Sequence, residues 1–368
     1  MENQRTCSLC GAPLTEENTH EFGGQALCTD CFCDNTVVCC HCGRRIWSDD
    51  AECYGRDYLC GGCYDNHYTT CEDCGRIISL DDAYYEEDND YPYCSTCYHN
   101  RHDSSIKNYS YKPTPIFYGE GNLFMGVELE IDGAGEDYDN AGELLDIGNA
   151  EHEHIYCKHD GSLCEGFEIV SEPATLSYHM NSLPWKAIFS KAIDMGYSSH
   201  NTSTCGLHVH CNRTAFGETY EEQEAAIGRV VFFVERHWDD LVNFSRRKAE
   251  NLNRWASRYA TISNTTAETY KKAKDKYLGR YVAVNLTNRD TIEFRLFRGT
   301  LRYKTFVATL QLVQHICTLA TILSDKDFES MSWSKFVLSI DSEDKELIEY
   351  LKARRLYVNE ETNESEEY

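Results

Sequence analysis

Two glutamates in an otherwise apolar stretch are the first residues in this sequence whose spacing suggests chemistry. Residues 124–131 read Phe-Met-Gly-Val-Glu-Leu-Glu-Ile. Side chains of a β-strand alternate between its two faces, so Glu128 and Glu130 would share one face and the apolar residues between them the other. Neighbouring carboxylates repel one another, and a cation or solvent relieves that repulsion. Alone, this stretch is better explained as an ordinary half-solvated strand than as a cation site.

The same alternation recurs further along the chain. Residues 205–213 place His208 and His210 on one face of an expected strand. Residues 155–163 and 166–173 are expected to pair as a hairpin around an Asp-Gly turn, with Glu168 on the face opposite to its apolar neighbours. Two imidazoles at i and i+2 favour a metal or phosphate site more than a single histidine does.

A fourth expected strand, residues 290–299, adds a carboxylate and a guanidinium. Glu293 and Arg295 share a face, whereas Arg298 has the opposite parity unless a β-bulge or the strand end turns it. Mg²⁺ prefers carboxylates, water and substrate phosphates, and arginine neutralises the charge of a transferring phosphoryl group. The combined set therefore fits divalent cations bound with a polyphosphate, although the sequence contains no Walker loop and no kinase motif set.

The cysteines form a separate pattern near the N-terminus. Fifteen of the 20 precede residue 98, and twelve of these form six Cys-x-x-Cys pairs that repeat every 32 residues, each first pair followed by glycine. Two such knuckles close a tetrahedral thiolate site with no open position, so we predict three structural zinc sites. Their ligands would be Cys7, Cys10, Cys28 and Cys31; Cys39, Cys42, Cys60 and Cys63; and Cys71, Cys74, Cys94 and Cys97. The units resemble LIM-type treble-clef fingers, and we expect their surface to recruit a protein partner or a substrate.

Length and composition limit the remaining possibilities. The chain has 368 residues and a formal charge of −26, with 61 acidic and 35 basic side chains. This balance argues against nucleic-acid binding, which needs clustered lysine and arginine. No apolar run approaches the ~20 residues that cross a bilayer, and the first residues lack the basic and apolar regions of a signal peptide. We therefore expect a cytoplasmic protein with no membrane partner.

The elements that must position these residues fall into two domains. We expect three zinc modules in residues 1–100, a polar linker with Pro113 and Pro115 over 101–118, an α+β domain over 119–356 and an acidic tail over 357–368. Periodicity predicts one long amphipathic helix over residues 219–250 and an apolar helix over 301–323 that packs on the sheet.

Five motifs occur in the order found in the amidoligases. They are GVELE at 126–130, DGSL at 160–163, GFEIVS-x-P at 166–173, GLHVH at 206–210 and TIEFR-x-x-x-GTL at 291–301. Over roughly residues 119–355 the chain resembles this family, which is grouped with glutamine synthetase and glutamate–cysteine ligase among the carboxylate–amine ligases. The zinc array lies outside the resemblance, as an N-terminal extension.

The resemblance implies a curved antiparallel sheet with packed helices, whose concave face binds ATP and Mg²⁺. It implies that ATP phosphorylates a small-molecule or peptide carboxylate and that an amine displaces phosphate to form an amide. Carried over by position, the metal- or nucleotide-binding residues would be Glu128, Glu130, Glu168, His208, Glu293 and Asn285. The catalytic residues would be Arg295, Arg298, His210 and Asp160. Asp160 and Asn285 also have ordinary structural explanations, as a turn former and a polar strand residue.

Two other functions remain open from the sequence. A metal-dependent hydrolase could use the same histidines and carboxylates to hold a metal and its water, without needing a nucleotide. An adaptor could bind a partner through the zinc modules and carry an inactive ligase-like domain. Against the adaptor, none of the expected ligand positions is occupied by an apolar residue.

Overall fold

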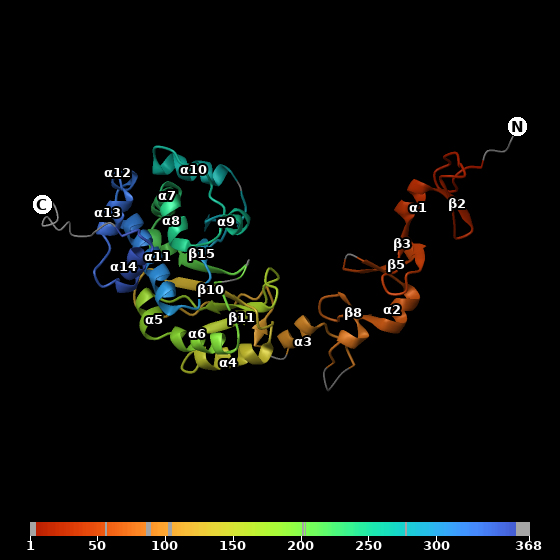
Figure 1. Ribbon diagram of the computed structural model, residues 1–368, viewed down its shortest axis with the longest axis horizontal. Coiled ribbons are helices and arrows are strands. Elements are labelled where there is room, and N and C mark those ends of the chain that lie inside the picture. The colour runs from red at the N-terminus through yellow and green to blue at the C-terminus, as the bar shows by residue number, and fades with distance from the viewer. Residues whose placement is uncertain are drawn as a thin grey trace, which may run out of the picture. The chain divides into compact units, whose positions relative to one another are not determined.

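The structure is a computed structural model that describes residues 5–55, 57–85, 90–101, 105–200, 202, 204–276 and 278–357. Contacts within the chain divide it into two compact units, Met1–Ser104 and Ser105–Tyr368 (Figure 1). Apart from Tyr357, the expected acidic tail lies outside the described residues.

The first unit is built from two-stranded hairpins and short helices. Its described helices and strands are β1 (Thr19–Phe22), β2 (Gln25–Cys28), α1 (Thr29–Asn35), β3 (Thr36–Val38), β4 (Arg45–Trp47), β5 (Ala51–Tyr54), β6 (Asp57–Cys60), α2 (Gly61–His67), β7 (Tyr68–Thr70), β8 (Ile77–Ser79) and α3 (Ser95–Arg101). The strands pair as β1–β2, β3–β4, β5–β6 and β7–β8. Each helix starts directly after the third cysteine of a module and carries the fourth.

The repeat in the sequence produces the same turn three times. Gly11, Gly43 and Gly75 have φ angles of 73°, 73° and 68°, and each donates its N–H to the carbonyl of the first cysteine of its module at 2.9 Å. This left-handed conformation favours glycine, because a side chain would be strained there. The residue before each third cysteine is buried, with exposures of 0%, 0% and 1% for Leu27, Leu59 and Tyr93.

The second unit contains a seven-stranded sheet in the order β14-β15-β13-β10-β12-β11-β9. The strands are β9 (Ile106–Lys107), β10 (Met125–Asp132), β11 (Ile155–Lys158), β12 (Gly166–Ser171), β13 (Gly206–Asn212), β14 (Val284–Asn285) and β15 (Thr291–Arg298). All neighbours pair antiparallel except β9, which runs parallel to β11. The sheet is therefore mixed, and the expectation of a wholly antiparallel sheet is wrong at this edge. Part of the stretch expected to be a linker supplies that strand.

Helices pack around the sheet, and several of them, such as α6 and α11, cover its apolar face. They are α4 (Tyr138–Gly148), α5 (Leu176–Asn181), α6 (Trp185–Asp194), α7 (Tyr220–Arg236), α8 (Trp238–Ser245), α9 (Ala249–Trp255), α10 (Thr266–Asp275), α11 (Tyr303–Ile322), α12 (Asp325–Glu329), α13 (Trp333–Leu338) and α14 (Lys345–Ala353). Val127, Leu129 and Ile131 of β10 are fully buried in one core with Trp185 of α6 and Phe306 of α11. In Figure 1, α4 and α6 lie beneath β10 and β11.

Helix α11 belongs to this core. Among the described helices it is the one long and apolar enough to cross a membrane by length and composition, with a mean hydropathy of 1.4. However, 67% of its most apolar window is buried inside the unit, which is the environment of a core helix.

The prediction of one helix over residues 219–250 is wrong. Thr219 and Glu222 form a capping box at the start of α7, but this helix ends at Arg236. Helix α8 ends at Ser245 and is followed by Arg246, whose φ is 58°. The apolar periodicity continues through Phe244, and neither break contains glycine or proline. The sequence therefore carries no local signal for the breaks, which reorient the residues that follow Ser245.

Candidate active site and zinc modules

The register of the central strands places the expected ligands on one face of the sheet. Glu128 of β10 lies opposite His208 of β13, and Glu130 lies opposite Glu168 of β12. His210 lies opposite Glu293 of β15. Directly opposed residues of antiparallel strands point to the same face, with Cβ atoms about 4.5–5.5 Å apart. Four strands therefore bring four carboxylates and two imidazoles together, as the alternation in the sequence predicted.

Glu128 is the centre of this cluster. One of its carboxylate oxygens lies 3.2 Å from Nε2 of His210, and the other lies 3.4 Å from Nδ1 of His208. Two sets of potential ligand atoms lie within 4.8 Å of one another, Glu128 with His210 and Glu293, and Glu128 with Glu168 and His208. Because both sets include Glu128, the arrangement has the form of two adjacent cation sites that share a carboxylate.

Burial and neighbouring charges shift the pKa values of the carboxyl groups in different directions. Burial raises the pKa of Glu128, but His210 and His208 outweigh it and hold that pKa well below its ordinary value. Burial, followed by the neighbouring Glu128 carboxylate, raises the pKa of Glu168 well above its ordinary value, although Lys158 lies 3.7 Å away. Burial also raises the pKa of Glu130. The protein's own cations therefore do not fully compensate this cluster, and a bound cation would.

The imidazoles of His208 and His210 each have a nitrogen atom that could coordinate a cation. Nε2 of His208 and Nε2 of His210 are buried, and although they lie 3.9 Å from Glu130 and 3.2 Å from Glu128, neither has a partner with hydrogen-bond geometry among the described residues. Nδ1 of His210 lies 3.2 Å from the hydroxyl of Thr291, a contact that can fix the ring orientation. Carboxylate oxygens suit Mg²⁺ and Mn²⁺, and imidazole also suits transition metals. The residues present therefore fit divalent cations.

Neighbouring side chains hold Glu293 in place. The amide nitrogen of Asn285 donates to one oxygen of Glu293 at 2.7 Å, and Arg295 forms an ion pair with the other. Asn285 in turn accepts hydrogen bonds from the backbone N–H and the hydroxyl of Thr287, at 2.9 and 2.8 Å. Burial raises the pKa of Glu293, but His210 and Arg295 help to bring it below its ordinary value. Asn285 thus orients a ligand candidate.

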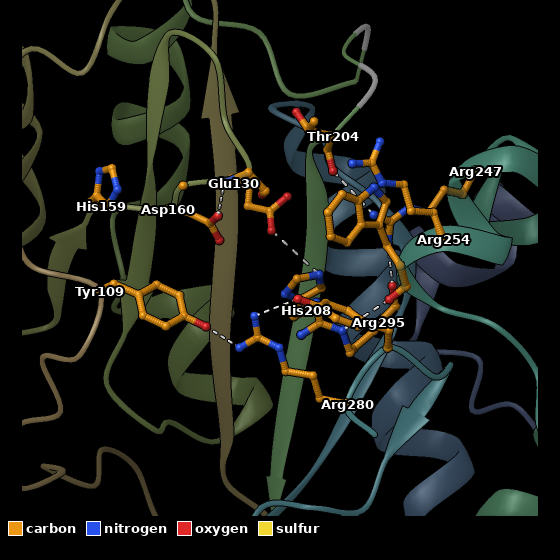
Figure 2. Close-up of a pocket in the computed structure, with 14 residues that line it drawn as sticks. Tyr109, Glu130, His159, Asp160, Thr204, His208, Arg247, Arg254, Arg280 and Arg295 are labelled. Carbon is orange, nitrogen blue, oxygen red and sulfur yellow. Dashed lines mark hydrogen bonds and ion pairs between the residues drawn. The ribbon is translucent and has the colours of Figure 1, made fainter. Parts of the chain in front are cut away.

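A pocket of about 560 Å³ opens beside the cluster (Figure 2). Four residues expected from the sequence line it, namely Glu130, Asp160, His208 and Arg295. Arg298 is not among the lining residues. A bulge in β15 places it opposite Gly206, and its pKa is lowered by burial and by the charge of Arg246. The structure therefore separates Arg298 from the other candidates.

The pocket also contains residues that the sequence analysis did not select. They are chiefly Tyr109, Arg247, Arg254, Trp255, Arg280 and Tyr281. Arg247 follows the break after α8 and is 5% exposed, and its guanidinium donates to the carbonyls of Arg295 at 2.7 Å and of Thr204 at 3.4 Å. The run Ser-Arg-Arg-Lys was visible in the sequence, but a basic helix C-terminus explained it equally well.

Lys158 is a further missed residue, outside the pocket lining. It is buried on β11 directly opposite Glu168. The signal for it was available, because Lys158 occupies a strand position that pairs with Glu168 once the expected hairpin is aligned. Its ammonium group contributes positive charge at the edge of the carboxylate cluster.

The cysteines of the first unit form the three sets expected from the sequence. Each set places four sulfur atoms within 4.8 Å of one another. Sulfur atoms of Cys10 and Cys28, Cys42 and Cys60, and Cys74 and Cys94 lie 3.7, 3.9 and 3.8 Å apart. A tetrahedral site with Zn–S bonds of ~2.3 Å requires about 3.8 Å between sulfurs. The clusters are consistent with zinc modules.

Comparison with known proteins bears on the second unit. Residues 148–317 match a family model described as "Putative amidoligase enzyme". The matched segment contains Glu168, both histidines, Glu293 and Arg295, whereas Glu128 and the zinc modules lie before it. No curated protein matches the chain. The family match supports a ligase-type enzyme.

Proposed function

We propose that the second unit is an ATP-dependent ligase that joins a carboxylate to an amine through an acyl phosphate. The observation that carries this proposal is the pair of ligand sets that share Glu128, next to the pocket residue Arg295. Adjacent divalent cations and guanidinium groups are the combination that phosphoryl transfer requires. The amidoligase match supports the same class of reaction.

The ligands of the cations would be the carboxylates and imidazoles of the two sets. Glu128, His210 and Glu293 would hold one, and Glu128, Glu168 and His208 the other. When bound, Mg²⁺ or Mn²⁺ neutralises the phosphate oxygens of ATP and the transferring phosphoryl group. Glu130, whose carboxylate accepts the N–H of Gly206 at 2.5 Å, would support the edge of this site near the pocket.

The reaction would have two steps. An oxygen of the substrate carboxylate attacks the γ-phosphorus of ATP, the bond to the β–γ bridging oxygen breaks, and ADP leaves. The amine nitrogen then attacks the acyl carbon, a C–N bond forms, the C–O bond to phosphate breaks, and the amine loses a proton to solvent. Arg295 would bind oxygens of the phosphoryl group, and Asn285 would keep the Glu293 carboxylate aligned.

The zinc modules would have a different role. Four closed thiolate ligands leave no coordination position for water or substrate, so these zincs would be structural. We propose that the surface of the modules recruits a protein partner or brings a protein-linked substrate to the ligase unit.

Incubation of purified protein with ATP, Mg²⁺ and mixtures of amino acids and short peptides tests the reaction class. The expected result is release of ADP and phosphate together with new amide masses that are one water lighter than the sum of two substrates. Cleavage of a substrate that requires metal but no nucleotide would instead favour the hydrolase. A protein that neither consumes ATP nor binds it would favour the adaptor.

A further inference from the structure

The carboxylates and imidazoles that would hold the cations are called the cation cluster below; they are Glu128, Glu130, Glu168, Glu293, His208 and His210. The pocket beside this cluster has two walls of opposite charge. One wall presents the carboxylates of Glu130 and Asp160, and the other presents the guanidinium groups of Arg254 and Arg280. Figure 2 shows Arg280 reaching into the pocket opposite Glu130 and Asp160, with His208 between the two walls. A ligand that fills this space must therefore satisfy both signs of charge.

The cationic wall is held in place by aromatic groups. Arg280 donates to the hydroxyl groups of Tyr109 and of Tyr281, the latter at 2.9 Å. Arg254 lies over the ring of Trp255, 4.5 Å from its centre. Among the described residues, neither guanidinium has a carboxylate within ion-pair distance. Their positions are fixed, and their charges remain available to an anion.

The anionic wall is fixed in a similar way. One oxygen of Asp160 accepts the backbone N–H of Ser162 at 2.7 Å, which closes the turn after β11. Glu130 accepts the N–H of Gly206 at 2.5 Å. No lysine or arginine lies within ion-pair distance of Asp160 among the described residues. This wall favours a cationic group and would repel a second polyphosphate.

We propose that this pocket binds the amine substrate of the ligase and that this substrate is a free α-amino acid. Its carboxylate would lie on Arg280 and Arg254, and its ammonium group would lie between Asp160 and Glu130. This inference rests on the proposed ligase function and adds the class of the amine substrate. A zwitterion is the small ligand whose charges match both walls.

The arrangement also orients the ligand for reaction. Glu130 lies directly opposite Glu168, and His208, between the two walls, lies opposite Glu128. The ammonium end would therefore lie next to the cation cluster where the acyl phosphate forms. The carboxylate end would lie on two arginines that are both exposed on the outer side of the pocket. The amine, rather than the acid, is the end presented for attack.

Binding of amino acids and their charge-blocked derivatives tests this proposal without requiring the acid substrate. The probes are the 20 common amino acids, their N-acetyl forms and their carboxamides, titrated into full-length protein by calorimetry or ligand-observed NMR. We expect at least one free amino acid to bind and its affinity to fall about tenfold or more when either charged end is blocked, because each block leaves one wall unpaired.

Matched variants assign each end of the ligand to a wall. Arg280→Gln should weaken binding of the free amino acid about as much as amidation of its carboxylate does. The affinity for the carboxamide should change little. Asp160→Asn keeps an acceptor for the Ser162 N–H and should reproduce the effect of N-acetylation. Arg289→Gln, at an arginine that is 94% exposed, and Asp146→Asn, on the surface of α4, are the controls and should bind as the unmodified protein does.

The outcomes separate this inference from the proposed function. If Mg²⁺-dependent binding of an ATP analogue is normal but no free amino acid binds, or blocked derivatives bind equally well, the inference is wrong and the ligase proposal stands. The inference would also be overturned if inorganic pyrophosphate or a dicarboxylate bound in place of amino acids and this binding were lost in Arg280→Gln. If the ATP analogue does not bind at all, the proposed function itself fails.

Discussion

The two units use metal-ligand residues in opposite ways. In the first, the four cysteines of each module surround one point and would complete the coordination of a tetrahedral ion. In the second, glutamates and histidines from four strands form overlapping sets of three, with buried imidazole nitrogens that have no hydrogen-bond partner among the described residues. A complete ligand set stabilises a fold, whereas an incomplete one leaves positions for water and substrate. We therefore propose a structural role for the metal of the first unit and a chemical role for that of the second.

The units also differ in what else holds them together. The described residues of the first unit form only small buried clusters, such as Leu59 with Cys39, Cys60 and Cys63. The second has a single extensive core between the sheet and its helices. Removing metal should therefore unfold the first unit and leave the second folded.

The largest expected effect is the loss of zinc. Apparent binding energies of structural zinc are about 10 kcal/mol or more, so chelation should unfold the modules. Elemental analysis should find three zincs per chain, and hydrogen exchange after chelation should rise across residues 5–101 but not across the sheet. Cys60→Ser should lower the zinc content to two, whereas Cys33→Ser, at an exposed cysteine outside the clusters, should leave it at three. Folded, reduced protein without zinc would contradict this account.

A substitution that creates a cavity in the core of the second unit should destabilise that unit and leave the zinc modules unchanged. Leu129 is fully buried beneath the cation cluster, and Leu129→Ala should cost about 2–5 kcal/mol in the free energy of unfolding of this unit. Zinc content should not change. Urea unfolding followed by near-ultraviolet circular dichroism measures the first quantity, and elemental analysis the second. Loss of zinc in this variant would mean that the two units unfold together.

Acid should weaken the second unit through a buried histidine. His179 donates from Nε2 to the carbonyl of Met125 at 2.8 Å and accepts from the indole of Trp185 at 3.2 Å, and burial lowers its pKa to about 4. The unfolded chain takes up a proton below about pH 6.5 and the folded chain does not, so stability should fall by ~3 kcal/mol between pH 6.5 and 4.

The variant His179→Gln isolates this effect. Glutamine can donate to one partner and accept from the other but does not titrate. Its free energy of unfolding should therefore fall less between pH 6.5 and 4 than that of the unmodified protein. Parallel pH profiles would assign the acid sensitivity to other groups.

Much of the site could be predicted because it depends on strand periodicity. Once Glu128, Glu168, His208 and Glu293 are assigned to strands, alternation fixes the face on which each side chain lies. Spacing likewise identified the cysteine sets, because ligands close in sequence form each knuckle. Strand alternation and cysteine spacing are both local patterns, so they can be recognised without knowledge of the fold.

The cationic wall could not be predicted for the opposite reason. Arg254 lies on the short helix α9 and Arg280 in a turn, and only the tertiary fold brings them, together with Arg247, to the pocket beside the sheet. Arg247 in particular required a break at Arg246 that the apolar periodicity does not signal. Tyr109 lay in a stretch interpreted as a linker, and the parallel strand that anchors it is only two residues long.

The most direct test of the central claim is calorimetric titration with a non-hydrolysable ATP analogue, with and without Mg²⁺. Binding should require Mg²⁺. Glu128→Gln, which removes one charge at nearly constant volume, should weaken binding about tenfold or more because both ligand sets lose their shared carboxylate. Glu343→Gln, at an exposed glutamate before α14, should bind as the unmodified protein does. Unchanged Mg²⁺-dependent binding in Glu128→Gln would contradict the assignment of this sheet face as the nucleotide and cation site.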